Sequence, residues 1–222
     1  MATGPTQAIP IDGVADERFA ARRLLRKSLL ERRLALTADE CAQLSSRVCT
    51  HLRDGFPQLS ALAVGFCWPV RNEADLRPLI DEWARAGKAG FQALLPVVID
   101  EQRGLAFRAW SVGTAMFPDR YGIPTPACGA FLTPGALLLP VNGFDAAGYR
   151  IGYGGGYFDR TLASLLPRPL VVGVGFELAR LDSIVPEPHD QRLDAMVTEA
   201  GVHYPKTAST TRESPLSPLP YR

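Results

Sequence analysis

The sequence predicts an α/β fold built on a mainly parallel sheet with helices on both faces. Predicted strands alternate with predicted helices along most of the chain, which is the order typical of that class. Several predicted strands, such as residues 59–68, are continuous apolar runs without in-out alternation, as expected of strands buried on both faces. Ligands of such sheets bind beyond the carboxyl ends of the strands, so the functional residues are expected in the loops at that edge. These loops are residues 68–73, 99–101, 143–159 and 177–190.

The composition is that of a soluble globular protein. Of the 222 residues, 46% are hydrophobic and 21% are charged, which suits the core of a single domain, placed here at residues 16–204. The net charge of +1 gives no bulk attraction to nucleic acid or to a membrane surface. No apolar run approaches the roughly 20 residues that span a bilayer. Residues 1–15 and 205–222 are rich in Pro, Gly, Ser or Thr and are predicted to be disordered.

The N-terminus and the cysteines indicate the cellular compartment. Residues 1–14 lack the basic-then-apolar pattern of a secretory signal. The four cysteines form no Cys-x-x-Cys pair and the three histidines are scattered, so neither a zinc site nor a disulfide framework is expected. The sequence therefore predicts a cytoplasmic protein with reduced thiols.

A helix with an apolar side and a strongly basic side is predicted to begin at Asp16. Arg22 and Arg26 are four residues apart, so they share one face of this helix. That face is either a solvated basic surface or a pair of cations directed at a nucleotide. The pattern leaves both interpretations open.

The remaining elements are predicted from apolar runs and from the residues that bound them. Thr37 and Glu40 are spaced as a capping box, which begins a second helix that ends before Gly55. Further helices are predicted at residues 74–86, closed by Gly87, and at residues 159–166. The predicted strands are residues 59–68, 91–99, 105–110, 137–141, 170–176 and a short one within 193–204. Residues 116–133 are predicted to form a long irregular loop, and such loops often carry function.

The functional prediction depends on the segment that follows the strand at residues 137–141. Four glycines, Gly152, Gly154, Gly155 and Gly156, lie within five residues and lead into a predicted helix. Glycine permits positive φ and close approach, so backbone N–H groups can converge on an anion next to the positive end of the helix. The segment therefore predicts a phosphate-binding loop, although neither a Walker A motif nor the dinucleotide fingerprint is present. The alternative is a flexible tight turn.

Carboxylates lie in or beside the predicted edge loops. Asp159 and Asp190 suit Mg²⁺, which takes few protein oxygens and keeps several waters, but each could instead be a cap for the segment that follows. Glu73 is either the N-cap of the helix after it or an acceptor for the N–H groups of a nitrogen heterocycle. The aromatic residues that could form flat walls for such a ring, or belong to the core, are Phe66, Trp68, Tyr153 and Tyr157. No nucleophile elbow is present, so a covalent mechanism is not supported.

These residues resemble the signature of the 5-formyltetrahydrofolate cyclo-ligase family, whose members are also called 5,10-methenyltetrahydrofolate synthetases. The resemblance is most specific at residues 140–145 and 150–160 and covers residues 20–203. Supporting matches lie in the family's order at residues 22–33, 68–80, 87–88, 95–98, 121–124, 186–194 and 197–199. The sequence departs from the family pattern at Arg22, where Lys is usual, at Leu76, where Thr is common, at Thr125, where Glu or Gln is usual, and at Phe158, where Tyr is common.

The resemblance implies a three-layer α/β/α sandwich that uses ATP and Mg²⁺ to close 5-formyltetrahydrofolate to 5,10-methenyltetrahydrofolate, with release of ADP and phosphate, in folate one-carbon metabolism. It implies that Asp159 and Asp190 bind Mg²⁺. The expected state is a monomer that binds these two substrates and neither nucleic acid nor a membrane. There are two alternatives. One is a non-catalytic folate- or nucleotide-binding regulator on the same scaffold, and the other is a kinase or ligase acting on a different pterin or small amide.

The resemblance also implies roles for individual residues. The implied ATP-binding residues are Arg22, Arg23, Leu24, Leu25, Arg26, Arg150, Ile151, Gly152, Tyr153, Gly154, Gly155, Gly156, Tyr157 and Phe158. The implied substrate-binding residues are Trp68, Glu73, Tyr153, Gly154, Gly155, Gly156 and Tyr157.

Overall fold

Five parallel strands form the centre of the main sheet. The computed structural model describes residues 11–206, and the side chains of residues 19–206. The strands of the sheet are β1 (Ala63–Gly65), β2 (Gln92–Val97), β3 (Ala106–Trp110), β6 (Ala136–Pro140), β9 (Leu170–Val174), β11 (Ala195–Thr198) and β12 (Gly201–His203). Within the described residues their order is β12-β11-β9-β6-β1-β2-β3, parallel except for the edge strands β3 and β12. This confirms the predicted α/β class.

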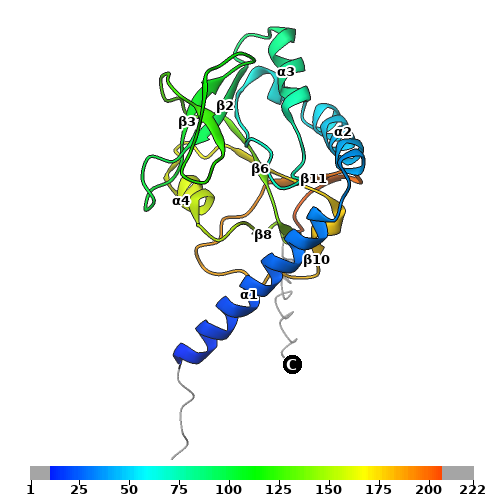
Figure 1. Cartoon of the computed structure of the whole chain (residues 1–222), viewed down its shortest axis with the longest axis vertical. Helices are drawn as coiled ribbons and strands as arrows, with labels where there is room; N and C mark the ends of the chain where they lie inside the picture. Colours follow the sequence, from blue (N-terminus) through cyan, green and yellow to red (C-terminus); the bar gives the residue numbers. More distant parts are fainter. Residues whose placement is uncertain (1–10, 207–222) are drawn as a thin grey trace, which may run out of the picture.

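Helices cover both faces of this sheet (Figure 1). They are α2 (Ala38–Gly55), α3 (Arg77–Ala86) and α4 (Tyr157–Ser164), whereas α1 (Ile11–Leu34) lies outside these layers. Successive residues of a strand point to opposite faces. In β6, Leu138 lies in a buried cluster with residues of α2 and α3, whereas Leu137 lies in a second cluster with Leu162 of α4. The two clusters make the three-layer sandwich that was predicted.

Local signals in the sequence explain several helix ends. Thr37 caps α2 and exchanges hydrogen bonds with Glu40, which confirms the predicted capping box. Gly87 ends α3 in the left-handed conformation, with φ of 61°, as predicted.

Helix α1 begins earlier than predicted, at Ile11, so residues 11–15 are helical and not disordered. It passes the carboxyl edge of the sheet and projects beyond the rest of the fold in Figure 1. Residues 1–10 and 207–222, for which disorder was predicted, lie outside the described residues.

Two predicted segments differ from the structure. The strand predicted at residues 59–68 is reduced to β1, because a 3-10 helix, η1 (Pro57–Ala61), precedes it and the chain leaves the sheet after Gly65. The irregular loop predicted at residues 116–133 contains a hairpin of β4 (Met116–Pro118) and β5 (Pro124–Pro126). Its turn is held by the Asp119 carboxylate, which accepts hydrogen bonds from two backbone amides of the turn.

Short strands account for the other differences. The single strand predicted within residues 193–204 is the antiparallel pair of β11 and β12. A small second sheet, which was not predicted, joins β7 (Gly143–Asp145), β8 (Arg150–Ile151) and β10 (Arg180–Leu181). Strands of two or three residues show no period in a sequence, so pairing between distant segments determines them.

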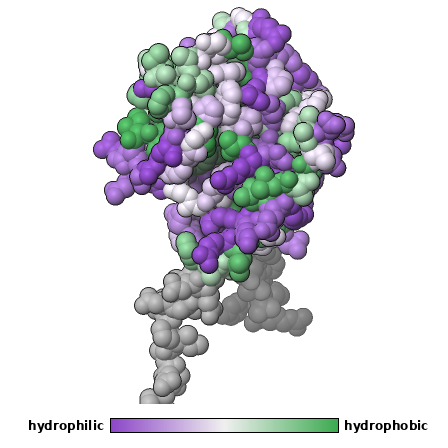
Figure 2. All heavy atoms as spheres, in the orientation of Figure 1, coloured by the Kyte–Doolittle hydropathy of each residue, from purple (hydrophilic) through white to green (hydrophobic). Residues whose placement is uncertain are grey.

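The surface is mixed in polarity. On the face that Figure 2 shows, hydrophilic and hydrophobic residues are interspersed. No helix within residues 11–206 combines the length and the apolar character that a bilayer span requires.

Candidate functional site

The candidate site lies at the carboxyl edge of the main sheet, where the loops after four parallel strands emerge. β1, β2, β6 and β9 are neighbours and run in the same direction, so their following loops meet at one edge, as predicted. Helix α1 brings three arginines to this edge. Arg22 contacts the loop between β10 (Arg180–Leu181) and β11, Arg26 packs on the Gly-rich loop and Arg33 reaches the loop after β1.

The Gly-rich loop leads the chain from β8 into α4. Gly154 and Gly156 have positive φ values of 97° and 65°, which favour glycine, and Gly152 and Gly155 complete the loop. Gly156 is the N-cap of α4, and no side chain of the described residues caps this helix. The first amide groups of α4 are therefore available as donors. A Cβ added at Gly154 would lie 3.3 Å from Arg26 Cζ, so a cation lies directly against this backbone.

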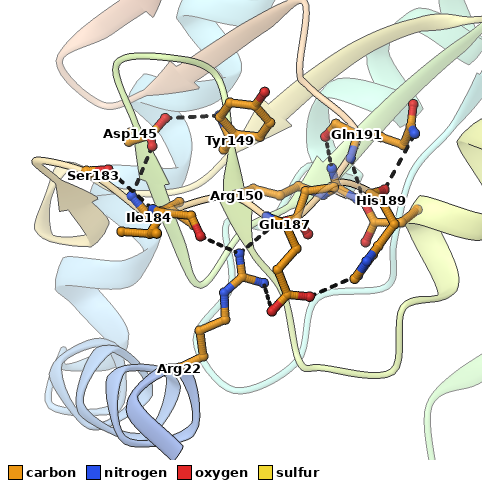
Figure 3. A network of polar contacts seen from close by, with 12 residues as sticks. Arg22, Asp145, Tyr149, Arg150, Ser183, Ile184, Glu187, His189 and Gln191 are labelled. Atoms are coloured by element: carbon orange, nitrogen blue, oxygen red, sulfur yellow. Dashed lines mark hydrogen bonds and ion pairs between the residues drawn. The ribbon is translucent and has the colours of Figure 1, made fainter. Parts of the chain in front are cut away.

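Arg22 and Arg26, which were predicted to share one face of the helix, have different surroundings. Arg22 donates to Asp190 Oδ2 at 2.6 Å and to the Val185 carbonyl at 3.2 Å, and it lies 3.6 Å from Glu187 (Figure 3). The Nε of Arg26 is buried and has no hydrogen-bond partner within the described residues. Burial, followed by the nearby Arg22 charge, lowers the pKa of Arg26. Arg22 is thus already paired, whereas Arg26 retains the capacity to bind an anion.

The two predicted metal ligands meet at the loop between β10 and β11: Asp190 lies in this loop, and Asp159 of α4 contacts it. Asp159 Oδ1 accepts hydrogen bonds from Arg150 at 2.8 Å and from the Gln191 amide at 3.0 Å. Asp190 Oδ2 accepts from Arg22 and from the Glu187 amide at 2.8 Å. Burial opposes ionisation of Asp190, but these two donors outweigh it and hold its pKa below the usual value. Neither carboxylate has the capping role offered as its alternative: Asp159 does not cap α4, and Asp190 accepts from a residue that precedes it.

Glu73 is buried in the loop after β1, with 6% of its surface exposed. Its Oε1 accepts from the Tyr153 hydroxyl at 2.7 Å, and its Oε2 accepts from the Val70 amide at 3.1 Å. Burial raises the pKa of Glu73, and the Tyr153 hydrogen bond and the charge of Arg33 oppose that rise. The N-cap of α3 is Leu76, so the capping role considered for Glu73 is wrong.

Sequence reasoning missed Arg33, which lies 3.8 Å from Glu73 and is buried. A signal was present, because Arg33 follows Arg26 by seven residues, about two helical turns, and so lies on the same face of α1. Among basic neighbours such as Arg32, the pattern alone does not distinguish a buried arginine from an exposed one.

The four aromatic residues predicted as walls of the site differ from one another in burial and position. Phe66 is 1% exposed and belongs to the core, so the core alternative holds for it. Trp68 is half-buried at the edge of that core. Tyr153 is 47% exposed, although its hydroxyl is bonded. The Tyr157 hydroxyl lies 3.0 Å from that of Tyr121, which links the β4–β5 hairpin to the Gly-rich loop.

The remaining implied ATP-binding residues do not all face the edge loops. Arg23 and Leu24 are exposed, and Leu25 is half-buried. Ile151 is 1% exposed within β8, and Phe158 packs against the cluster on the α4 side of the sheet. Ile151 and Phe158 therefore support the Gly-rich loop from within the fold.

A groove of about 430 Å³ lies between the carboxyl end of β2 and the β4–β5 hairpin. Thr125, which departs from the family pattern, lines this groove. It is 8% exposed, and its hydroxyl has no hydrogen-bond partner in the described part of the chain. Leu76, another departure, is 2% exposed and packs in the main core. Both residues that depart from the family pattern are therefore buried.

Comparisons with known proteins identify similar sequences and similar folds. The 5-formyltetrahydrofolate cyclo-ligase of Escherichia coli (strain K12) is 28% identical to this chain over 179 residues, which are 78% of this chain and 97% of that protein. The NMR structure of the 5,10-methenyltetrahydrofolate synthetase of Aquifex aeolicus matches with a TM-score of 0.72 and 26% identity, covering 86% of this chain and 96% of that one. The synthetase structure of Mycoplasma pneumoniae, at 22% identity, shares the fold with a TM-score of 0.64 over 80% of this chain and 98% of that one.

A match to a whole family accompanies these single relatives. The family model of the 5-formyltetrahydrofolate cyclo-ligases matches residues 18–199. This range includes α2, α3 and α4, the parallel strands and every loop of the candidate site. The chain therefore belongs to the 5-formyltetrahydrofolate cyclo-ligase family.

Proposed function

We propose that this protein closes 5-formyltetrahydrofolate to 5,10-methenyltetrahydrofolate with ATP and Mg²⁺, releasing ADP and phosphate. The observation that carries the proposal is the uncapped start of α4 beside the guanidinium of Arg26. Helix-start amides and a nearby cation form the type of site that phosphates occupy. Family membership supports a folate as the second substrate.

The reaction requires a better leaving group than the formyl oxygen. In the proposed sequence, the formyl oxygen attacks the γ-phosphorus of ATP, and the bond from that phosphorus to the ADP oxygen breaks. The second folate nitrogen then attacks the formyl carbon and loses its proton, while the carbon–oxygen bond breaks and phosphate leaves. No protein nucleophile is required, so the chain contributes positioning and charge neutralisation.

Several side chains are placed for these tasks. Arg26 and the amides at the start of α4 would bind the phosphates. Glu73 would accept hydrogen bonds from N–H groups of the pterin ring, since an ionised carboxylate only accepts. The exposed ring of Tyr153 offers an apolar surface close to that carboxylate.

Asp159 and Asp190 fit Mg²⁺ as a resident ion. Hydrogen bonds from the described residues occupy one oxygen of each carboxylate and leave the other for a ligand. Within residues 11–206 no cluster of three or more His, Cys, Asp or Glu is placed to hold a metal. Proteins often bind Mg²⁺ through one or two carboxylates together with substrate phosphates, so these two carboxylates are the ligands that we propose. When bound, the ion would neutralise charge on the phosphate oxygens.

The proposal is tested with purified protein, ATP, Mg²⁺ and 5-formyltetrahydrofolate, by following the absorbance of the methenyl product. Asp159→Ala is expected to abolish ATP-dependent product formation and to leave the fold intact by circular dichroism. Asp39→Ala, an exposed carboxylate at the start of α2, is the control and should keep wild-type activity.

Each outcome has a separate meaning. Full activity of Asp159→Ala would reject the metal assignment. Wild-type protein that binds 5-formyltetrahydrofolate without turnover would support the non-catalytic regulator instead. The expectation of a cytoplasmic monomer remains a prediction.

A further inference from the structure

Arg33 lies in the last turn of α1 with 5% of its surface exposed. All three guanidinium nitrogens donate hydrogen bonds: Nε to the Arg71 carbonyl at 2.9 Å, Nη1 to Asn142 Oδ1 at 2.8 Å and Nη2 to the Tyr153 hydroxyl at 2.7 Å. Arg71 lies in the loop after β1, Asn142 follows β6 and Tyr153 lies in the Gly-rich loop. One side chain therefore joins three segments of the candidate site.

A chain of hydrogen bonds leads from Arg33 to Glu73. Because Arg33 donates to the Tyr153 oxygen, the hydroxyl hydrogen is directed at Glu73 Oε1, 2.7 Å away. Arg33 Nη2 itself lies 3.8 Å from the same carboxylate oxygen. The orientation of Glu73 is thus set by α1 and by the Gly-rich loop as well as by its own loop.

The loop that carries Glu73 is held in an unusual backbone conformation by contacts with the end of α1. Arg71 and Asn72 have positive φ values of 52° and 58°, a conformation that residues with a Cβ rarely adopt without compensation. Arg33 Nε donates to the Arg71 carbonyl, and the side-chain Nδ2 of Asn72 donates to the Leu36 carbonyl, just beyond α1, at 3.0 Å. The end of α1 therefore fixes both unusual residues.

Among the charged groups around Glu73, Arg33 is the principal buried cation. The titratable groups that face Glu73 are Arg33 from α1, Arg71 and Cys67 from the loop after β1, and Tyr153 from the Gly-rich loop. Arg71 is exposed, whereas Arg33 is buried, and electrostatic interactions are stronger where water is excluded. Arg33 therefore favours the ionised form of a carboxylate that burial would otherwise protonate.

We infer that Arg33 is a positioning residue of the cyclo-ligase reaction, which holds the Glu73 carboxylate and the Tyr153 hydroxyl in the geometry that receives the pterin ring. This inference rests on the proposed function, because it takes Glu73 as the acceptor for the ring. A guanidinium suits the task, since its planar fork serves acceptors from three separate segments. A lysine ammonium carries the same charge on a flexible stem without that geometry.

The test compares wild-type protein with Arg33→Met, Arg33→Lys and the double variant Arg33→Met/Glu73→Gln, in steady-state kinetics between roughly pH 5 and 9. Arg33→Met is expected to raise the KM for 5-formyltetrahydrofolate at least about tenfold and to leave the KM for ATP unchanged. The acid limb of its pH profile should move up by about one unit or more, because the carboxylate loses a nearby cation. In the double variant this limb should disappear.

Arg32→Met, the exposed neighbour on α1, is the matched control and should keep both KM values and the pH profile. Equal changes in both KM values with an unmoved acid limb would overturn the inference, since a purely structural residue gives that pattern. If thermal unfolding shows that Arg33→Met does not fold, Arg33→Lys decides. A raised KM for the folate with an unmoved limb supports the inference, and wild-type kinetics reject it. Inactive wild-type protein would reject the proposed function itself.

Discussion

At the scale of single residues, Arg26 is a cation that lies against the glycine backbone of the Gly-rich loop. Its guanidinium packs against Gly154, and its Nε has no partner within the described residues. A buried donor without a partner is unfavourable, so an anion that accepts from this nitrogen would stabilise the arrangement. Arg22 differs, because Asp190 already neutralises it at 2.6 Å.

We therefore expect Arg26→Ala to weaken ATP binding by roughly 10- to 100-fold, the effect of losing a hydrogen bond to a charged group. Isothermal titration with ATP and Mg²⁺ measures this affinity. Arg32→Ala removes an exposed arginine from the same helix and should bind ATP as the wild type does. Equal affinity of Arg26→Ala and the wild type would place the nucleotide elsewhere.

The residue types of the site were predictable, but their partners were not. Arg22, Arg26 and Glu73 were found from spacing and from position at strand ends, because both signals are local. The burial of Arg33 depends on carbonyl and hydroxyl acceptors that are 38 and 120 positions away in the chain. No pattern within one helix carries that information.

At the scale of elements, one carboxylate ties the edge hairpin of β11 and β12 to the turn η2 (Glu177–Ala179). Glu177 accepts hydrogen bonds from Arg180 at 2.7 and 3.0 Å, and from the Thr198 hydroxyl at 2.6 Å, and lies 2.8 Å from His203 Nε2. The Arg180 hydrogen bonds, helped by Thr198, outweigh burial and lower the pKa of Glu177 to about 2. Such a group stabilises the folded state above its unfolded pKa, and the contribution is lost as the pH falls through the folded pKa.

Consequently, the urea midpoint of the wild type should fall between about pH 5 and pH 2 more steeply than that of Glu177→Gln. The variant should also be less stable than the wild type at neutral pH, where the ionised carboxylate contributes. Glu31→Gln, on an exposed part of α1, should follow the wild-type curve. Parallel curves for the wild type and Glu177→Gln would remove Glu177 from the account of acid stability.

Elements with a strong local signal were predicted, and elements made by pairing were not. The capping box of Thr37 and Glu40 lies within four residues, so α2 was located correctly. The β4–β5 hairpin contains Pro118, Pro124 and Pro126, residues that disfavour strands. Distant contacts hold it in place, since Arg108 of β3 donates hydrogen bonds to the Pro126 and Ala127 carbonyls.

At the scale of the whole molecule, β6 separates the two halves of the core. Its residues alternate between the α2–α3 side and the α4 side of the sheet, and Leu138 is fully buried on the first of these sides. A side chain in such a position touches several elements at once. Its loss should therefore affect the stability of the whole domain and not one helix alone.

Leu138→Ala is expected to lower the free energy of unfolding by about 2–5 kcal/mol, through lost burial and the cavity that remains. The melting temperature should fall by roughly 2–4 °C for each kcal/mol in a chain of this size. Urea unfolding followed by circular dichroism gives the value. Leu166→Ala, at a position 86% exposed, should change it by less than about 0.5 kcal/mol, and a similar loss in both variants would contradict the account.

The class of the whole fold followed from the sequence, whereas its strand order did not. Continuous apolar runs such as residues 137–141 indicate strands covered on both faces, whichever strands are their neighbours. That β6 lies between β1 and β9, and that β3 and β12 close the sheet in the antiparallel direction, depends on contacts between distant segments.

Helix α1 also fixes the spacing between Arg26 and Arg33. Arg26 and Arg33 are seven residues apart on one unbroken helix, a spacing of about 10 Å along its axis and close to two full turns. Deleting a single residue between them would shorten the rod by about 1.5 Å and rotate one arginine by about 100° relative to the other. Arg26 could then contact the Gly-rich loop, or Arg33 could reach Tyr153 and Glu73, but not both. Under the proposed function, the length of this stretch would fix the distance between the bound nucleotide and the bound folate.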